Sequence, residues 1–253
     1  MRVAILGAGD IGCAVGIALA ADGADVTFIG RDSPTGRELK EAVAAGGARL
    51  QHSSWDVAIS AEVCSASFTT DVSALARVEI ILLACKRHHN ATLAPSITKY
   101  ASSSALVLAL QNGVGVDGEL RSLLGASGPA AHYAVVNFNI VREILGDGRG
   151  AVFRWTSPRR RNPPAFLLPS GKGTSALAEV MDKAGLMTTT TDNIARAAYG
   201  KLIVNAGGNA INALSGVDIR AMVRTPGYRK LMPYLLTYLL TYLLTYLLTY
   251  LLR

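Results

Sequence analysis

Cysteine is scarce in this sequence. The 253 residues include three cysteines, Cys13, Cys64 and Cys85, and no two of them form a Cys-x-x-Cys pair. An odd count without paired spacing argues against a disulfide framework. Each cysteine lies within or beside an apolar segment, so we expect reduced, buried thiols in a cytoplasmic protein. The first apolar run leads into a glycine-rich turn, which indicates a strand and not a signal peptide.

Charged side chains are also few, at 17% of the residues, which excludes a disordered chain of high charge. The formal net charge is +7, and part of it lies in an arginine run at 159–161 that we interpret as a solvated loop. No RNA-binding motif, zinc-ligand spacing or long basic helix accompanies the charge, so small anionic ligands are favoured over nucleic acid. His88 and His89 are adjacent, without further ligands in a metal-binding pattern, and no metal site is predicted.

What the sequence does have is a series of apolar runs, and half of its residues are hydrophobic. Their alternation with helical stretches predicts an α/β fold with a parallel, doubly wound sheet. Strands are predicted at 2–6, 25–29, 78–84, 105–110 and 186–190, and helices at 11–21 and 174–184. Residues 130–155 form a strand-rich segment with a turn at 146–150, and a Pro/Arg-rich loop at 156–165 follows it.

The first strand runs into the sequence Gly-Ala-Gly-Asp-Ile-Gly. In a strand–turn–helix unit this spacing is the fingerprint of a dinucleotide site, because each glycine has a separate task. Gly7 permits the tight turn, Gly9 lets the backbone approach the pyrophosphate, and Gly12 lets the helix pack closely on the sheet. The helix N-terminus then offers N–H groups to the phosphates. The predicted cofactor-binding residues of this loop are Gly7, Ala8, Gly9, Asp10, Ile11 and Gly12; the alternative is a glycine turn without a ligand.

The end of the second strand distinguishes the two nicotinamide cofactors. An acidic residue there binds the ribose 2′-hydroxyl of NAD, whereas an arginine accommodates the 2′-phosphate of NADP. Arg31 is the first side chain beyond this strand and its glycine, and Asp32 follows it. We therefore predict NADPH as the cofactor. NAD is the alternative, because the carboxylate of Asp32 could bind the ribose 2′-hydroxyl.

Two further strand ends carry polar residues. Lys86 follows the strand at 78–84, and Asn112 follows the strand at 105–110. Ligands of open α/β sheets lie at the carboxyl ends of the strands, so both residues are candidates for cofactor binding, and Asn112 also for substrate binding. The alternative for Lys86 is an exposed surface lysine without a ligand, and the alternative for Asn112 is a structural Asn-Gly turn.

From Asp192 onward the pattern is helical. Lys201, Asn205, Asn209 and Asn212 are spaced four, four and three residues apart, so a helix carries all of them on one face. The rest of this helix is apolar and is expected to be buried, and buried polar groups need partners. A polar substrate would supply them. Lys201 could stabilise and protonate the alkoxide that forms when a hydride reduces a ketone.

Together these motifs resemble the ketopantoate reductase (2-dehydropantoate 2-reductase) family over roughly residues 1–220. The resemblance rests on Gly-Ala-Gly-Asp-Ile-Gly, Lys86, Leu-Gln-Asn-Gly-Val-Gly at 110–115 and the Lys-x3-Asn-x3-Asn helix. It implies NADPH-dependent reduction of 2-dehydropantoate, a 2-oxo acid, to (R)-pantoate on the way to pantothenate and coenzyme A. Lys201 would be the general acid, and Asn205 and Asn209 would bind substrate, with Asn112 and Lys86 at the cofactor–substrate junction. A homodimer is left open.

The C-terminal part departs from the family, whose later helices carry a substrate-binding serine and an active-site glutamate. This chain has no acidic residue after Asp218 and no serine after Ser215. Residues 234–252 repeat Tyr-Leu-Leu-Thr almost perfectly, and Arg253 ends the tail. Its period of four matches no helical repeat and leaves no defined apolar side. We interpret the repeat as an expansion or frame error, with a membrane anchor as the alternative.

The resulting domain prediction has three parts. A Rossmann domain at 1–191 binds the cofactor, an incomplete helical domain begins at 192–233, and the repeat tail occupies 234–253. The alternatives to an active reductase are a catalytically impaired NADP-binding remnant of the family and a membrane-tethered nucleotide-binding protein.

Overall fold

A computed structural model describes residues 1–58, 66–144, 150–157 and 163–251. The chain divides into two compact units, Met1–Ala195 and Arg196–Arg253. Cys64, the arginine run at 159–161 and most of the predicted turn at 146–150 lie outside the described residues.

The first unit is built on a six-stranded sheet in which every strand pairs in parallel with its neighbours. The strand order is β5-β2-β1-β6-β7-β8, so the chain starts in the middle, moves to one edge, and then returns to build the other half. This reversal is that of a doubly wound dinucleotide-binding sheet, and the predicted fold class is confirmed. The strands are β1 (Arg2–Leu6), β2 (Asp25–Ile29), β5 (Ala66–Thr69), β6 (Ile80–Leu83), β7 (Leu106–Ala109) and β8 (Ala130–Tyr133).

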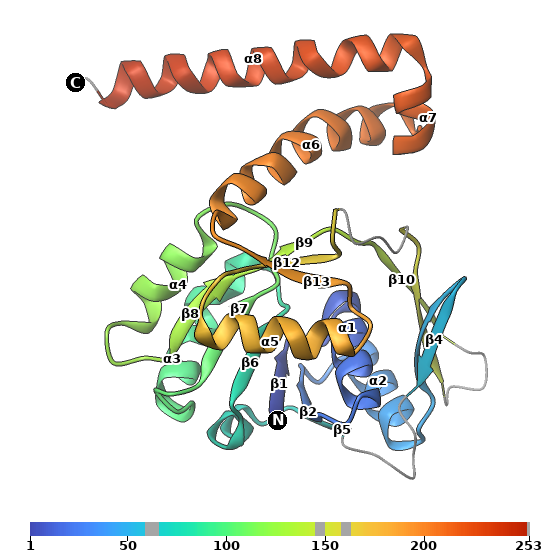
Figure 1. Ribbon diagram of the computed structural model, residues 1–253, viewed down its shortest axis with the longest axis vertical. Helices are drawn as coiled ribbons and strands as arrows, with labels where there is room; N and C mark the ends of the chain where they lie inside the picture. Colours follow the sequence, from blue (N-terminus) through green and yellow to red (C-terminus); the bar gives the residue numbers. More distant parts are fainter. Residues whose placement is uncertain (59–65, 145–149, 158–162, 252–253) are drawn as a thin grey trace. The chain divides into compact units, whose positions relative to one another are not determined.

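Helices cover both faces of this sheet. Because parallel crossovers are right-handed, helices that lead toward opposite edges lie on opposite faces. Figure 1 shows α1 and α2 on one side of the strands and α3 and α4 on the other. The helical segments are α1 (Asp10–Ala21), α2 (Pro34–Ala44), α3 (Asn90–Tyr100), α4 (Val116–Leu124) and the 3-10 turns η1 (Val72–Arg77) and η2 (Arg87–His89).

A second sheet, which the sequence did not predict as such, packs on the outer side of α1. Its order is β10-β11-β3-β4, and it joins strands from two distant parts of the chain. Because sheets lie on both sides of α1, every residue from Gly12 to Ala20 is buried. An apolar, alanine-rich helix without a polar face suits this position. The strands are β3 (Ala48–His52), β4 (Trp55–Ala58), β10 (Ile140–Ile144) and β11 (Ala151–Trp155).

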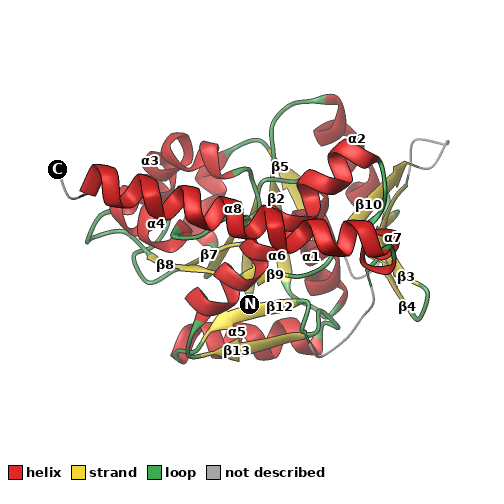
Figure 2. Ribbon diagram, turned by 90° about the horizontal axis from the view of Figure 1, so that it is seen from above, coloured by secondary structure: helices red, strands yellow, loops and turns green. Residues whose placement is uncertain are grey.

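A third, three-stranded sheet completes the first unit, in the order β13-β12-β9. α5 (Lys172–Lys183) packs along β12 and β13 (Figure 2). The predicted helix at 174–184 and the predicted strand at 186–190 correspond to α5 and β13. The strands are β9 (Val135–Val136), β12 (Phe166–Pro169) and β13 (Thr188–Thr191).

The second unit is helical: α6 (Ile194–Ser215) leads into it, and α7 (Ile219–Arg224) and α8 (Pro226–Leu251) follow. The repeat continues α8 as one helix, and Tyr234 and Tyr238 remain 76% and 70% exposed. Leu236 of α8 approaches α6 at Gly207, where an added Cβ would lie 3.4 Å from the leucine Cγ. In the part of the chain that the structure describes, no helix meets the length and hydropathy needed to cross a membrane.

One expectation about α6 is wrong. Its apolar residues were expected to be buried, yet Leu202, Ile203 and Val204 are 42%, 46% and 56% exposed, and Leu214 is 91% exposed. The sequence of the neighbouring helix α8 repeats every four residues, which differs from the helical period of about 3.6. Its leucines therefore wind around the helix instead of forming one continuous apolar side. The approach of Leu236 to Gly207 leaves these four residues of α6 exposed.

Candidate functional site: the dinucleotide loop and its surroundings

The turn between β1 and α1 requires glycine at two positions. Gly7 has φ +104°, and a Cβ there would lie 2.5 Å from the backbone nitrogen of Cys85 on the neighbouring strand end. At Gly12 a Cβ would lie 2.5 Å from the carbonyl oxygen of Gly7. Both close contacts involve backbone atoms, which cannot move aside as a flexible side chain can. The turn is therefore tight for the reasons that the fingerprint predicts.

Gly9 differs, because nothing lies within 4 Å of where its Cβ would be. It caps α1 in an extended conformation, with φ −83°, and its carbonyl accepts the first helical hydrogen bond from the N–H of Cys13 at 2.8 Å. The N–H groups of the first helical turn have no acceptor within a helix and are free to bind an anion. An open approach beside these donors fits the pyrophosphate of a dinucleotide.

An ion pair flanks this loop. Asp10, the first residue of α1, has its carboxylate oxygen Oδ1 3.6 Å from Nε of Arg142 on β10. Cys13 lies one turn further along the helix, fully buried, and its thiol donates to the carbonyl of Ala8 at 3.4 Å. Burial raises the pKa of the Cys13 thiol, so the thiol stays protonated, as expected for a structural cysteine.

At the tip of β2, the two residues predicted to discriminate between the cofactors differ in their contacts. Arg31 is exposed, whereas the Asp32 carboxylate accepts a 2.6 Å hydrogen bond from Nη1 of Arg37 on α2. Ser33 caps α2 by accepting from the N–H of Gly36 at 3.1 Å. The carboxylate is thus already paired with a cation, while the arginine beside it faces solvent.

The ends of β6 and β7 bring Lys86 and Asn112 to one edge of the sheet. The two strands are neighbours and parallel, so the residues that follow them emerge side by side. Both side chains are exposed. Gly7, Arg31, Lys86 and Asn112 all follow carboxyl ends of strands in the same sheet, which is where open α/β sheets bind ligands.

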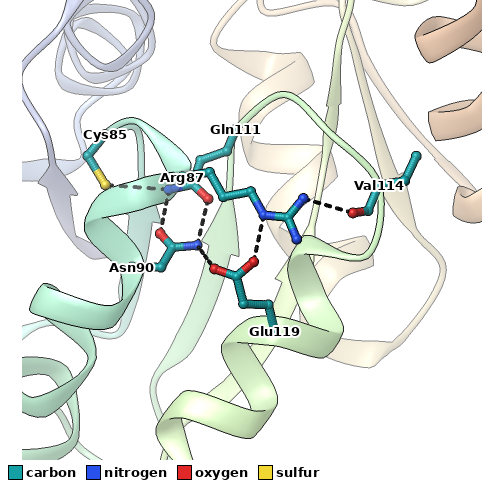
Figure 3. Close-up of polar contacts among 6 residues, drawn as sticks. All are labelled: Cys85, Arg87, Asn90, Gln111, Val114 and Glu119. Atoms are coloured by element: carbon teal, nitrogen blue, oxygen red, sulfur yellow. Dashed lines mark hydrogen bonds and ion pairs between the residues drawn. The ribbon is translucent and has the colours of Figure 1, made fainter.

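A polar network with a buried centre connects these two strand ends (Figure 3). Asn90 and Gln111, which are 1% and 5% exposed, exchange two side-chain hydrogen bonds of 3.0 and 2.7 Å. The amide of Asn90 also donates to Glu119 at 3.2 Å, and Glu119 accepts a 2.6 Å bond from Nε of Arg87. Arg87 in turn donates to the carbonyl of Val114 at 3.0 Å. The network therefore ties the loop after β6 to the loop after β7.

Sequence reasoning missed this network. Gln111 directly precedes Asn112, and it also donates to the thiol of Cys85, which directly precedes Lys86. Buried amides that bond to each other satisfy their polar groups at low cost and hold their backbones in place. A polar residue directly after each apolar strand was the available signal, but its partners come from helices that were not assigned.

The predicted catalytic side chains lie on α6. Lys201 and Asn205 are half-buried, and Asn209 is exposed. Burial lowers the pKa of Lys201 to about 8 from its ordinary value of 10.5. Asn212, the fourth member of the stripe, donates to the carbonyl of Val217 at 2.6 Å, so it secures the turn that ends the helix. Within the described ranges no cluster of three or more His, Cys, Asp or Glu could hold a metal ion.

Comparison with known proteins gives consistent results. The family described as "Ketopantoate reductase PanE/ApbA" matches residues 3–147, which include the glycine loop, Arg31, Lys86 and Asn112. The 2-dehydropantoate 2-reductase of Halobacterium salinarum is 28% identical over 230 residues, covering 89% of this chain and 69% of the relative. That of Pyrococcus horikoshii is 31% identical over 216 residues, covering 85% of this chain and 64% of the relative.

Among solved structures, a PanE/ApbA family ketopantoate reductase from Ralstonia eutropha superimposes with a TM-score of 0.72 and 30% identity, over 92% of this chain and 70% of that one. The chain thus spans about two thirds of the length of such relatives. Because the family match covers more than half of the chain and includes the glycine loop, the chain belongs to the ketopantoate reductase PanE/ApbA family.

Proposed function

We propose that this chain binds NADPH in its first unit and reduces 2-dehydropantoate to (R)-pantoate. The observation that carries the proposal is the glycine loop, which leaves open backbone at Gly9 beside the N-terminus of α1 in a chain of this family. NADPH would supply the hydride. The chain's own residues would bind the phosphates, orient the substrate and deliver a proton to the carbonyl oxygen.

The choice of NADPH over NADH is supported by the end of β2. A 2′-phosphate needs a cation, and Arg31 offers an exposed guanidinium at the place where the adenosine ribose lies in this fold. A ribose 2′-hydroxyl needs a carboxylate, but that of Asp32 already pairs with Arg37 at 2.6 Å. Because its carboxylate is already engaged by Arg37, Asp32 is less available to bind the ribose of NAD.

Replacing Arg31 with alanine is expected to weaken NADPH binding about tenfold or more, because a charge-assisted contact with the 2′-phosphate is lost. NADH binding should stay the same, because NADH has no 2′-phosphate. Fluorescence titration of the purified protein with each cofactor measures both affinities. Arg121→Ala, which removes an exposed arginine paired with Asp117 on α4, is the control for net charge. Equal affinity of the unmodified chain for the two cofactors would exclude this role of Arg31.

Lys201 is the proposed proton donor. A lysine whose pKa lies near 8 carries a proton at neutral pH and releases it readily to a developing alkoxide. Asn205, Asn209 and Asn112 have amide groups that can hold the hydroxyl and carboxylate of a 2-oxo acid. Their assignment rests on the resemblance to the family and on their motif positions.

A second candidate function is favoured by one observation. The chain carries no acidic residue after Asp218 and no serine after Ser215, although the family resemblance implies a glutamate and a serine in later helices. The chain would then bind NADPH but turn over poorly. Each lost transition-state contact typically costs about 10²–10³ in rate.

Steady-state kinetics with 2-dehydropantoate and NADPH, run beside a cofactor titration, separate the two candidates. The relative from Halobacterium salinarum serves as the full-length control. A kcat/KM within tenfold of that control supports an active reductase, whereas cofactor binding with a kcat/KM at least about 10²-fold lower supports the second candidate. Absence of cofactor binding would refute both.

A further inference from the structure

Arg142 reaches the cofactor loop from the second sheet. It stands opposite Phe153 in the antiparallel pairing of β10 with β11. Cross-strand partners point to the same face of a sheet, and Phe153 is fully buried on the face that packs on α1. The strand therefore directs the guanidinium of Arg142 toward α1, and its side chain is only 24% exposed.

The residue that it meets is the one acidic residue of the glycine loop. Asp10 occupies the first position of α1, where a carboxylate stabilises the helix through its dipole. The same carboxylate places a negative charge beside the N–H groups that are proposed to hold a pyrophosphate. An uncompensated carboxylate there would repel the ligand. Because Arg142 Nε lies 3.6 Å from Asp10 Oδ1, the guanidinium offsets the negative charge of the carboxylate.

The other ion pairs of this sheet have a different arrangement. Arg154 pairs with Glu143 at 2.7 Å, and both side chains belong to the sheet and are 51% exposed. Arg49 and Asp56 likewise join β3 to β4. The Asp10–Arg142 pair instead connects the sheet to the first residue of the cofactor helix.

We propose that Arg142 is a positioning residue of the dinucleotide site, which neutralises Asp10 so that the loop accepts the pyrophosphate. The inference rests on the proposed binding of a nicotinamide dinucleotide and assigns a role that lies outside the glycine motif. It concerns the part of the cofactor that NADPH and NADH share. The effect of Arg142 must therefore be the same for both, unlike that of Arg31.

The test is a double-mutant cycle read by cofactor affinity. Arg142→Gln is expected to weaken the binding of NADPH and of NADH by the same factor, about tenfold, because one anionic charge is left beside the phosphates. Adding Asp10→Asn to this variant should restore both affinities to within about threefold of the unmodified chain, because the repelling charge is gone. High salt should shrink the defect of the single variant.

Arg154→Gln is the matched control. It removes an arginine from the same sheet and changes the net charge equally, but it leaves the Asp10–Arg142 pair in place. Cofactor affinity should be unchanged in this variant. Thermal unfolding of all the variants without cofactor shows whether the sheet itself is damaged.

Three results would overturn the inference. The double variant could bind as weakly as Arg142→Gln, which would mean that Arg142 contacts the ligand or supports the sheet. Arg142→Gln could weaken the binding of NADPH but not of NADH. It could also leave both affinities unchanged. If Arg142→Gln does not fold, Asp10→Asn alone decides: it should bind both cofactors at least as tightly as the unmodified chain, and weaker binding contradicts the inference. An unmodified chain that binds neither cofactor refutes the proposed function as well.

Discussion

Lys201→Ala is expected to reduce turnover of 2-dehydropantoate by at least about 10²–10⁴-fold, the usual contribution of a positioned proton donor. NADPH affinity should stay nearly the same, because the phosphates are assigned to the loop from Gly7 to Gly12 in the other unit. Steady-state kinetics and cofactor titration measure the two quantities. Lys230→Ala removes an exposed lysine from α8 and is the control. Normal turnover by Lys201→Ala would make Lys201 a structural residue.

The pH profile separates a proton donor from a lysine that only shapes the site. The folded-state pKa of Lys201, about 8, lies below the ordinary 10.5, since burial disfavours its charged form. The ammonium is therefore present at neutral pH and is lost as the pH rises through 8. The rate should fall over the same range. In Lys201→Arg the guanidinium stays charged, so any residual activity should not show this fall. A wild-type rate that is level up to pH 10 would contradict the assignment.

Gly7→Ala is expected to destabilise the first unit by about 3 kcal/mol or more, which lowers its melting temperature by about 10 °C. Gly7 has φ +104°, a conformation unfavourable for alanine, and the new methyl group would lie 2.5 Å from the backbone nitrogen of Cys85. Either the turn after β1 or the end of β6 has to move. Cofactor binding should be lost together with the stability. Thermal unfolding and cofactor titration check both.

Gly9→Ala is the matched comparison in the same loop. Its backbone is extended and the space around the added Cβ is open, so the melting temperature should be unchanged. A methyl group there keeps the pyrophosphate from the backbone, so affinity for NADPH should fall about tenfold or more. If Gly9→Ala bound NADPH normally, the pyrophosphate would not lie at this position. A stable Gly7→Ala would show that the turn can relax.

The sequence predicted the parts of the fold that depend on local signals. The strand at 2–6, the glycine turn and the strand at 25–29 correspond closely to β1 and β2, because a buried parallel strand is a continuous apolar run and the turn needs glycine at fixed positions. The second sheet could not be predicted in the same way. Its strands β3 and β11 are about a hundred residues apart in the chain, and pairing at that distance leaves no periodic trace in either segment.

The residues of the candidate site also fall into those that local sequence signals predict and those that only the folded chain reveals. Roles for residues that belong to a motif could be predicted from the sequence: Gly12 from the spacing of the glycine loop, and Asn112 from its place after a strand and the family resemblance. Arg142 and Glu119 could not be identified in this way, because each contacts a motif residue, or a neighbour of one, only in the folded chain. The burial of α6 was wrongly predicted from its apolar composition. The composition of a helix shows whether it has apolar side chains to bury. Whether they are buried depends on which elements pack against the helix in the folded chain.

The position of α1 between two sheets has a consequence for cofactor exchange. A helix packed on one side can detach in a local opening that leaves the rest of the domain intact. α1 has no such route, because its release would separate it from the strands on both sides at once, and the cost would approach that of unfolding the whole unit. In the proposed dinucleotide site, cofactor binding and release would therefore occur with α1 in place.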